Sequence, residues 1–280
     1  MHTIDANKAL TLARAVLTIE ARAVAQVSDR LDASFAAAVS LILTCSGRVV
    51  VSGIGKSGHI AHKIAATLAS TGTPAFFVHP AEASHGDLGM ITAHDVVLAI
   101  SNSGESAELV TLLPPIKRRG TRLIAMTGNA ASTLGRAADV HLDASVGEEA
   151  CPLGLAPTSS TTAALALGDA LAVVLLDARG FTAEDFASSH PGGKLGRRLL
   201  VHVSDVMHKG ERLPVVREDS DLAGALLEMG AKGLGMTAVV DQHGVLTGVF
   251  TDGDLRRALA KGTDIRMLQV RELMTPAPRT

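Results

Sequence analysis

Apolar residues recur at three- and four-residue steps through roughly the first 45 residues of the chain. The series comprises Leu10, Ala13, Leu17, Val24, Val27, Leu31 and Phe35. This spacing is the period of one face of a helix. Ser28 and Asp29 interrupt the series. We therefore predict helix over residues 5–45, broken into two helices near these polar residues.

Short and continuously apolar runs follow, each about as long as a β-strand. They occupy residues 48–53, 75–78, 95–101, 122–128 and 138–142. Continuous rather than alternating apolar residues suit strands that are buried on both faces of a parallel sheet. The intervening segments have helical patterns, at residues 57–70, 105–118 and, after a loop at 143–158, 159–179. This alternation of strands and helices predicts an open α/β sandwich.

The character of the chain changes after about residue 200. The segment VSDVM at 203–207 opens a second unit that we expect to end near Lys261. The segment VRELM at 270–274 repeats it position by position, as valine, polar, acidic, apolar and methionine. This is an internal repeat. Because the sequence stops at Thr280, we expect the second copy to be incomplete.

Charge and amino-acid composition limit the classes of function that this protein can have. The net charge is −2, and the chain has six Phe but no Tyr or Trp. A nucleic-acid partner would require a basic stripe or stacking aromatics. Two distant cysteines, Cys45 and Cys151, fit a reducing compartment. No signal peptide and no apolar run of about 18 residues is found. We expect a cytoplasmic protein without nucleic-acid or membrane partners.

The stretch VVVSGIGKSGHIA at 49–61 joins a predicted strand to a predicted helix through a glycine-rich turn. A Walker A loop would need glycine five positions before Gly55, where the chain has Val50. A dinucleotide fingerprint would need an acidic residue at the end of the next strand, where the chain has His79 and Pro80. A smaller phosphorylated ligand is the remaining interpretation, because glycines and a helix N-terminus favour anions.

A second loop of the same kind, ISNSGESAEL at 100–109, supports the smaller ligand. It supplies the hydroxyls of Ser101, Ser103 and Ser106, with Gly104 at the turn. In an open parallel sheet such loops meet at the carboxyl ends of the strands. Two short loops with one lysine suit a single phosphate monoester. The alternative is an ordinary helix-capping turn, since Ser and Asn are favoured there.

These segments are recognisable. GIGKSGHIAHKIAATLASTGTPAFFVHPAEASHGDLGM, AISNSGESAEL and SSHPGGKLGRRLL together resemble the sugar isomerase (SIS) domain of D-arabinose-5-phosphate isomerases. GVFTDGDLRRAL at 248–259 resembles a cystathionine-β-synthase (CBS) domain. The resemblance implies an α/β fold, with a flavodoxin-like three-layer SIS sandwich around a five-stranded parallel sheet at 1–200. A small α+β CBS domain at 204–264 and an incomplete second CBS repeat at 270–280 would follow.

The resemblance also implies a reaction. Members of this family interconvert D-ribulose 5-phosphate and D-arabinose 5-phosphate through an enediol, as the first step toward the Kdo sugar of lipopolysaccharide. The reaction requires no redox cofactor. The family implies a homo-oligomer, a tetramer, whose sites take residues from more than one subunit. The alternatives are an isomerase of another sugar phosphate and a non-catalytic phosphosugar sensor.

Four residues are the catalytic candidates. Lys56 lies in the glycine-rich turn, where it can pair with an oxyanion or the phosphate, and Glu108 follows the serine loop. The resemblance selects Glu149 rather than its neighbour Glu148. His190 precedes a proline, which disfavours helix there, and histidine titrates near neutral pH. We expect His190 and Glu149 to share the proton transfer, with Glu108 and Lys56 orienting them. The alternative for each is a solvated loop or helix-end charge.

The remaining candidates bind rather than react. The resemblance implies substrate contacts by Ser57, Gly72, Thr73, His79, His85, Ser101, Ser103 and Ser106. His79 is also a candidate for capturing zinc, which would inhibit the enzyme rather than serve it. In the CBS unit, Thr251 and Asp254 follow a short strand in a pattern that holds a ribose in such domains. The alternative for this pair is a capped helix start.

Overall fold

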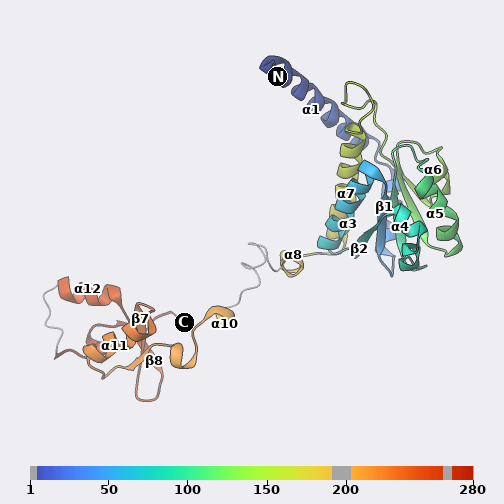
Figure 1. Ribbon diagram of the computed structural model, residues 1–280. Coiled ribbons are helices and arrows are strands. Elements are labelled where there is room, and N and C mark those ends of the chain that lie inside the picture. The colour runs from blue at the N-terminus through green and yellow to red at the C-terminus, as the bar shows by residue number, and fades with distance from the viewer. Residues whose placement is uncertain (1–4, 191–202, 261–266, 280) are drawn as a thin grey trace. The chain divides into compact units, whose positions relative to one another are not determined.

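The computed structural model describes residues 5–190, 203–260 and 267–279. The chain divides into two compact units, Met1–Leu200 and Val201–Thr280. Residues 191–200 of the predicted SSHPGGKLGRRLL motif lie outside the described residues, as do residues 261–264 at the predicted end of the CBS domain. Each unit has its own sheet (Figure 1).

The first unit is built on a five-stranded parallel sheet. Its strands are β1 (Val49–Gly53), β2 (Ala75–Val78), β3 (Val96–Ile100), β4 (Arg122–Thr127) and β5 (Val140–Asp143). They lie in the order β2-β1-β3-β4-β5, so the chain reverses direction across the sheet between β1 and β3. Ligands of open parallel sheets bind at such a switch point.

Helices cover both faces of this sheet and make three layers. One face is covered by α1 (Ala6–Asp29), α2 (Ala33–Leu43), α3 (Gly55–Ser70) and α7 (Ser159–Ala178). The other is covered by α4 (Pro80–Ser84), a short 3-10 helix (Asp87–Met90), α5 (Ala107–Arg118) and α6 (Thr133–Ala137). Val49 and Val51 pack in the first core and Val50 in the second. Because successive residues of β1 face two cores, the strand is continuously apolar. The predicted three-layer sandwich is confirmed.

The predicted break in the N-terminal helix is also confirmed. α1 ends at Asp29 and α2 starts at Ala33, with Asp32 accepting a hydrogen bond from the Ser34 amide at 2.8 Å. A capping carboxylate of this kind starts a new helix.

α7 runs through the centre of its layer. Within the described residues it is the one helix that passes a length and hydropathy test for crossing a membrane. The sequence had led us to expect none, because no uninterrupted apolar run approaches about 18 residues. Leu167, Leu171 and Leu175 are buried in the core of the first unit, and Asp169 forms an ion pair with Lys63 of α3. These contacts explain why α7 is apolar: it is a core helix of the first unit.

The second unit has a mixed four-stranded sheet. Its strands are β6 (Val215–Arg217), β7 (Met236–Val240), β8 (Leu246–Thr251) and β9 (Thr275–Pro276), in that order. Its helices are α10 (Val203–Val206), α11 (Leu222–Lys232) and α12 (Asp252–Ala260), with 3-10 turns at Gly210–Arg212 and Val270–Glu272. Val270 is fully buried, and Thr275 pairs with Val249 of β8. The segment expected to begin a second copy therefore packs onto the first.

Candidate active site

The glycine-rich turn follows β1 and leads directly into α3. A Cβ on Gly58 would lie 2.7 Å from the Gly53 carbonyl oxygen, which is too close for a carbon–oxygen contact. These glycines thus allow the first turn of α3 to pack against the end of β1. The N-terminus of this 16-residue helix carries the exposed Lys56 and the half-buried Ser57. Free amide groups and a nearby ammonium group make this end favourable for an anion.

The serine loop follows β3 and precedes α5. The Ser101 and Ser106 hydroxyls lie 2.9 Å apart, and the Gly104 amide donates to Ser101 Oγ at 3.1 Å. Gly104 has a φ of +68°, and a Cβ there would lie 2.0 Å from Ser132 Oγ. Of the three hydroxyls predicted to bind phosphate, two therefore bond each other and fix the loop. Ser103 is exposed.

Glu108 lies in the first turn of α5 and is exposed. A carboxylate there interacts favourably with the helix dipole. The serine loop also places this carboxylate on the helix that begins beside the predicted phosphate site. Both interpretations of Glu108 therefore agree with its position.

The two loops meet at one small cavity of about 40 Å³. Its polar lining comes from Ser57 of α3, Asn102 of the serine loop, and Ser160 and Thr161 at the start of α7. Three helix or loop segments that are distant in the sequence thus converge at the carboxyl edge of β1 and β3. The two loops converge as predicted, but the serine-loop residue with a polar side chain in the lining is Asn102 rather than Ser101, Ser103 or Ser106.

Glu149 lies at the N-terminus of α7, where its carboxylate is hydrogen-bonded to the amide of Ser160, a residue that lines this cavity. Its Oε2 accepts hydrogen bonds from the Thr158 amide at 2.7 Å, the Thr158 hydroxyl at 2.9 Å and the Ser160 amide at 3.3 Å. Burial raises the pKa of Glu149, but the hydrogen bonds from Ser160 and Thr158 outweigh burial and hold the pKa below its ordinary value. The carboxylate is therefore ionised at neutral pH.

The adjacent Glu148 has a different environment. Its side chain is 56% exposed and forms an ion pair with Arg22 of α1. From position in the sequence alone, either carboxylate could face the site. The structure places only Glu149 in the half-buried, hydrogen-bonded position.

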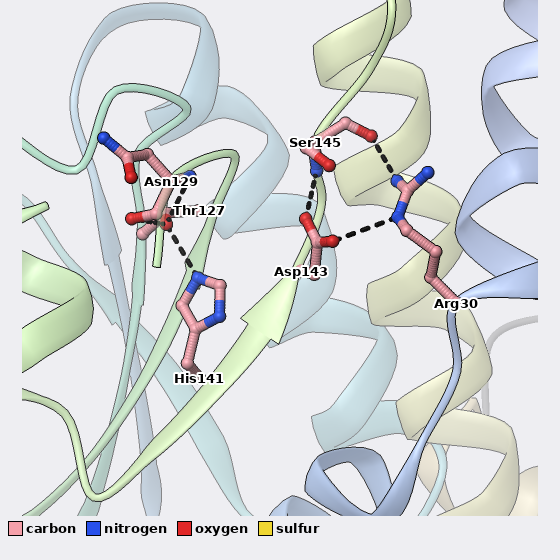
Figure 2. A network of polar contacts seen from close by, with 6 residues as sticks. All are labelled: Arg30, Thr127, Asn129, His141, Asp143 and Ser145. Carbon is pink, nitrogen blue, oxygen red and sulfur yellow. Dashed lines mark hydrogen bonds and ion pairs between the residues drawn. The ribbon is translucent and has the colours of Figure 1, made fainter. Parts of the chain in front are cut away.

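A polar network fixes the segment that leads from β5 to Glu149 (Figure 2). Asp143 accepts from the Ser145 amide at 2.9 Å and from Arg30 Nε at 3.0 Å, while Arg30 also donates to the Ser145 carbonyl. Burial raises the pKa of Asp143, but the bonds from Ser145 and the charges of Arg30 and His141 lower it overall. Next to it, His141 Nε2 lies 2.8 Å from the Thr127 hydroxyl. The loop that carries Glu149 therefore starts from an anchored position.

Two predicted binding histidines follow β2 at the same edge of the sheet. His79 caps α4, and its Nδ1 accepts a hydrogen bond from the Ala81 amide at 3.2 Å. Its Nε2 remains for a ligand. His85 ends α4 and is exposed. No group of three or more His, Cys, Asp or Glu side chains that could hold a metal occurs within the described ranges.

Within a single chain, His190 does not lie near Glu149. Glu149 lies at the start of α7, while His190 ends α8 (Ala183–Ser189), which follows the far end of α7 (Figure 1). A 20-residue helix is about 30 Å long. His190 stacks on Phe186 with ring centroids 4.3 Å apart.

Gly72 and Thr73 are also separate from the other candidates. They precede β2, at the amino edge of the sheet, whereas His79 follows the strand. Thr73 is 1% exposed and accepts from Arg179 Nε at 3.1 Å, and a Cβ on Gly72 would lie 2.4 Å from the ring of Phe181. The binding roles of Gly72 and Thr73, and the catalytic role of His190, stay predictions.

In the second unit, Asp254 is 6% exposed and satisfied by its own chain. It accepts from the Thr251 amide at 2.9 Å and hydroxyl at 2.7 Å, from Arg257 and from Thr275. Burial raises the pKa of Asp254, but the bonds from Thr251 and Arg257 hold it below its ordinary value. The helix-start interpretation describes these contacts, and ribose binding stays a prediction.

Four site residues were not singled out from the sequence. They are Asn102, Thr158, Ser160 and Thr161, which line the cavity or hold Glu149. The segment PTSST at 157–161, where the Ala/Leu-rich helix begins, is a helix-start signature that could have indicated the last three.

The chain is similar to known proteins over most of its length. Residues 42–174 match the SIS domain model and residues 203–261 match the CBS domain model. The arabinose 5-phosphate isomerase KdsD of Pseudomonas aeruginosa is 64% identical over 268 residues, which span 96% of this chain and 82% of that protein. KdsD of Escherichia coli K12 is 58% identical over 261 residues, spanning 93% and 80% of the two chains.

The fold has a close relative among solved structures. An Escherichia coli CFT073 protein in complex with arabinose 5-phosphate is 45% identical, with a TM-score of 0.66. The match covers 67% of this chain and all of that one. With these relatives, the chain belongs to the KdsD family of arabinose 5-phosphate isomerases, with an SIS domain followed by a CBS domain.

Proposed function

We infer that this chain interconverts D-ribulose 5-phosphate and D-arabinose 5-phosphate, the first step toward the Kdo sugar of lipopolysaccharide. Family membership supports the reaction. One geometric observation carries the mechanism: the ionised Glu149 is hydrogen-bonded to Ser160, which lines the cavity where the glycine-rich and serine loops meet.

The chemistry moves one proton between C1 and C2 of the open-chain sugar. Glu149 is ionised and can accept that proton, and the N-termini of α3 and α5 with Lys56 favour the phosphate and the developing enediolate oxygen. Glu108 orients the substrate or balances charge beside them. The carbon-bound proton leaves one carbon and returns to its neighbour, and a hydroxyl proton moves between O1 and O2. One carbon is oxidised as its neighbour is reduced, so no electrons are gained or lost overall and no redox cofactor is needed.

We further propose that the active site is completed by a second copy of the chain, in a tetramer. His190 lies at the other end of α7 from Glu149, so a neighbouring copy would supply it. The surface supports association: the N-terminal part of α1 projects from the sandwich (Figure 1). Large apolar side chains are exposed on α1, on α7 and on the loop before it, namely Leu10, Leu17, Leu153, Leu155 and Val173.

His79 is the proposed site of inhibitory zinc. Because its Nδ1 is engaged by the Ala81 amide, the metal would take Nε2 and compete with substrate. Titration with zinc chloride checks this, since zinc binding that is unchanged in His79→Ala would contradict it.

We also propose a cytoplasmic location, in keeping with the free thiols of Cys45 and Cys151. Cell fractionation would contradict that location by finding the protein elsewhere.

The test of function is a substrate panel with purified protein. D-ribulose 5-phosphate should give arabinose 5-phosphate, and Glu149→Gln and His190→Ala should each lower kcat by about 10²- to 10⁴-fold. Turnover of a hexose phosphate instead would replace the substrate assignment. Phosphosugar binding without turnover, unchanged in both variants, would indicate a sensor.

A further inference from the structure

The loop between Glu149 and Thr158 is closed at its base by a directed chain of hydrogen bonds. The Ala150 amide donates to Thr158 Oγ1 at 2.8 Å, and Thr158 Oγ1 donates to Glu149 Oε2 at 2.9 Å. An amide can only donate and an ionised carboxylate can only accept. The direction of both bonds is therefore fixed, and the hydroxyl proton points at Glu149.

Thr158 occupies the N-cap position of α7 but does not act as an ordinary cap. Its side chain makes no capping hydrogen bond to the helix within the described residues. The Glu149 carboxylate caps the helix instead, because its Oε2 accepts hydrogen bonds from the amides of Thr158 and Ser160. At an N-cap the threonine hydroxyl would usually accept from the amide of Ser160 or Thr161, so here it is available to hold the carboxylate.

All three of these bonds to Glu149 fall on Oε2. Anchoring one oxygen fixes the plane of the carboxylate and leaves Oε1 to exchange a proton. Catalytic geometry is sensitive to such anchoring, because small displacements of a reacting group cost rate.

We propose that Thr158 is a positioning residue for Glu149, whose hydroxyl holds the carboxylate in the orientation needed for proton transfer. The proposal rests on the proposed isomerase function. Thr158 itself is not required to touch the substrate.

The test compares Thr158→Val with Thr158→Ser in the full chain. Valine has the shape of threonine without the hydroxyl, so we expect kcat to fall by about 10- to 100-fold, as for loss of a hydrogen bond to a charged group. KM should change little. Removing a donor from the ionised carboxylate raises the pKa of Glu149, so the acid limb of the kcat–pH profile should move to higher pH. Thr158→Ser should restore both.

The chain offers a matched control one turn along α7. The Thr162 hydroxyl donates to Glu20 Oε2 of α1 at 3.1 Å, a bond of the same kind at a carboxylate outside the site. Thr162→Val should keep the wild-type kcat and pH profile.

The outcomes separate the two proposals. A wild-type protein that does not isomerise D-ribulose 5-phosphate overturns both. An active wild type with a folded Thr158→Val variant that behaves like Thr162→Val overturns the positioning role alone. If Thr158→Val does not fold, Thr158→Ser decides: a reduced kcat or shifted acid limb despite the retained hydroxyl contradicts the role.

Discussion

Within one chain, Glu149 lies at the N-terminal end of α7, while His190 lies beyond its C-terminal end. Glu149 accepts the first amides of α7, and His190 ends the short helix that follows its last turn. A helix of 20 residues keeps its ends about 30 Å apart, which is far beyond the reach of a shared proton. If both residues act on one substrate, they must come from different copies.

Mixing two inactive variants tests this arrangement. We expect Glu149→Gln and His190→Ala to be inactive separately and to regain activity when co-expressed. In randomly mixed oligomers about one quarter of the sites would combine an intact glutamate with an intact histidine from another copy. Isomerase activity of the purified mixture measures this.

The matched control is a mixture of Glu149→Gln with Glu149→Ala. Every site there lacks the carboxylate, so no activity should return. A Glu149→Gln and His190→Ala mixture that stays at this background, although native mass spectrometry shows mixed oligomers, would contradict a shared site.

Glu149 and Glu148 should differ sharply on substitution. Glu149→Gln removes the ionised proton acceptor, and a positioned acid–base group contributes about 10²- to 10⁴-fold, so kcat should fall by that factor. Glu148→Gln breaks only an exposed ion pair with Arg22, so kcat should stay at the wild-type value. Steady-state kinetics checks both, and equal losses would mean that the hydrogen-bonded position is not the catalytic one.

The serine loop should be intolerant of a side chain at its turn. Gly104→Ala adds a Cβ 2.0 Å from Ser132 Oγ at a φ of +68°, so we expect the loop to shift and KM for the sugar phosphate to rise about tenfold, by loss of about one charge-assisted hydrogen bond. Gly120 has a similar φ of +75° with no neighbour within 4 Å.

Gly120→Ala is therefore the control for backbone strain. Both variants should lose about 1–2 kcal/mol of stability from the left-handed conformation, measured by urea unfolding. Only Gly104→Ala should raise KM. An equal rise in both would remove the serine loop from phosphate binding.

Asp95 should make stability depend on pH. This residue is 2% exposed and accepts from the Arg48 amide at 2.7 Å and from the Thr92 amide and hydroxyl at 2.7 and 2.9 Å. Burial raises the pKa of Asp95, but the hydrogen bonds from Arg48 and Thr92 outweigh burial and hold it below its ordinary value. The stabilisation is therefore complete above the unfolded pKa of about 3.9, and is lost as pH falls through the folded pKa.

Asp95→Asn should lower the free energy of unfolding by about 2 kcal/mol at pH 7, and the difference from wild type should shrink below about pH 4. Urea unfolding across this range measures it. Asp169→Asn breaks an exposed ion pair with Lys63 and serves as the control with little effect. A difference for Asp95→Asn that stays constant in acid would contradict the assigned cause.

The elements of the first unit were predictable because each has a local pattern. The apolar run at 48–53 became β1 at Val49–Gly53, and the Ala/Leu-rich run at 159–179 became α7 at Ser159–Ala178. α6 was not predicted, since its five residues are too few to show a helical period. Local pattern also cannot show that residues 270–276 complete the sheet of the first CBS unit, because strand pairing depends on partners distant in the sequence.

The sequence by itself determined the fold class, the two glycine- and serine-containing loops and the family, since these depend on residue types at short spacing. The resemblance selected Glu149 over Glu148, but only the tertiary structure showed that Glu149 is hydrogen-bonded and half-buried while Glu148 is exposed, that Thr158 holds Glu149, and that His190 lies beyond the other end of α7. Adjacent residues differ in environment according to which distant groups pack against them. The distance between distant residues is set by the length and packing of the helix between them.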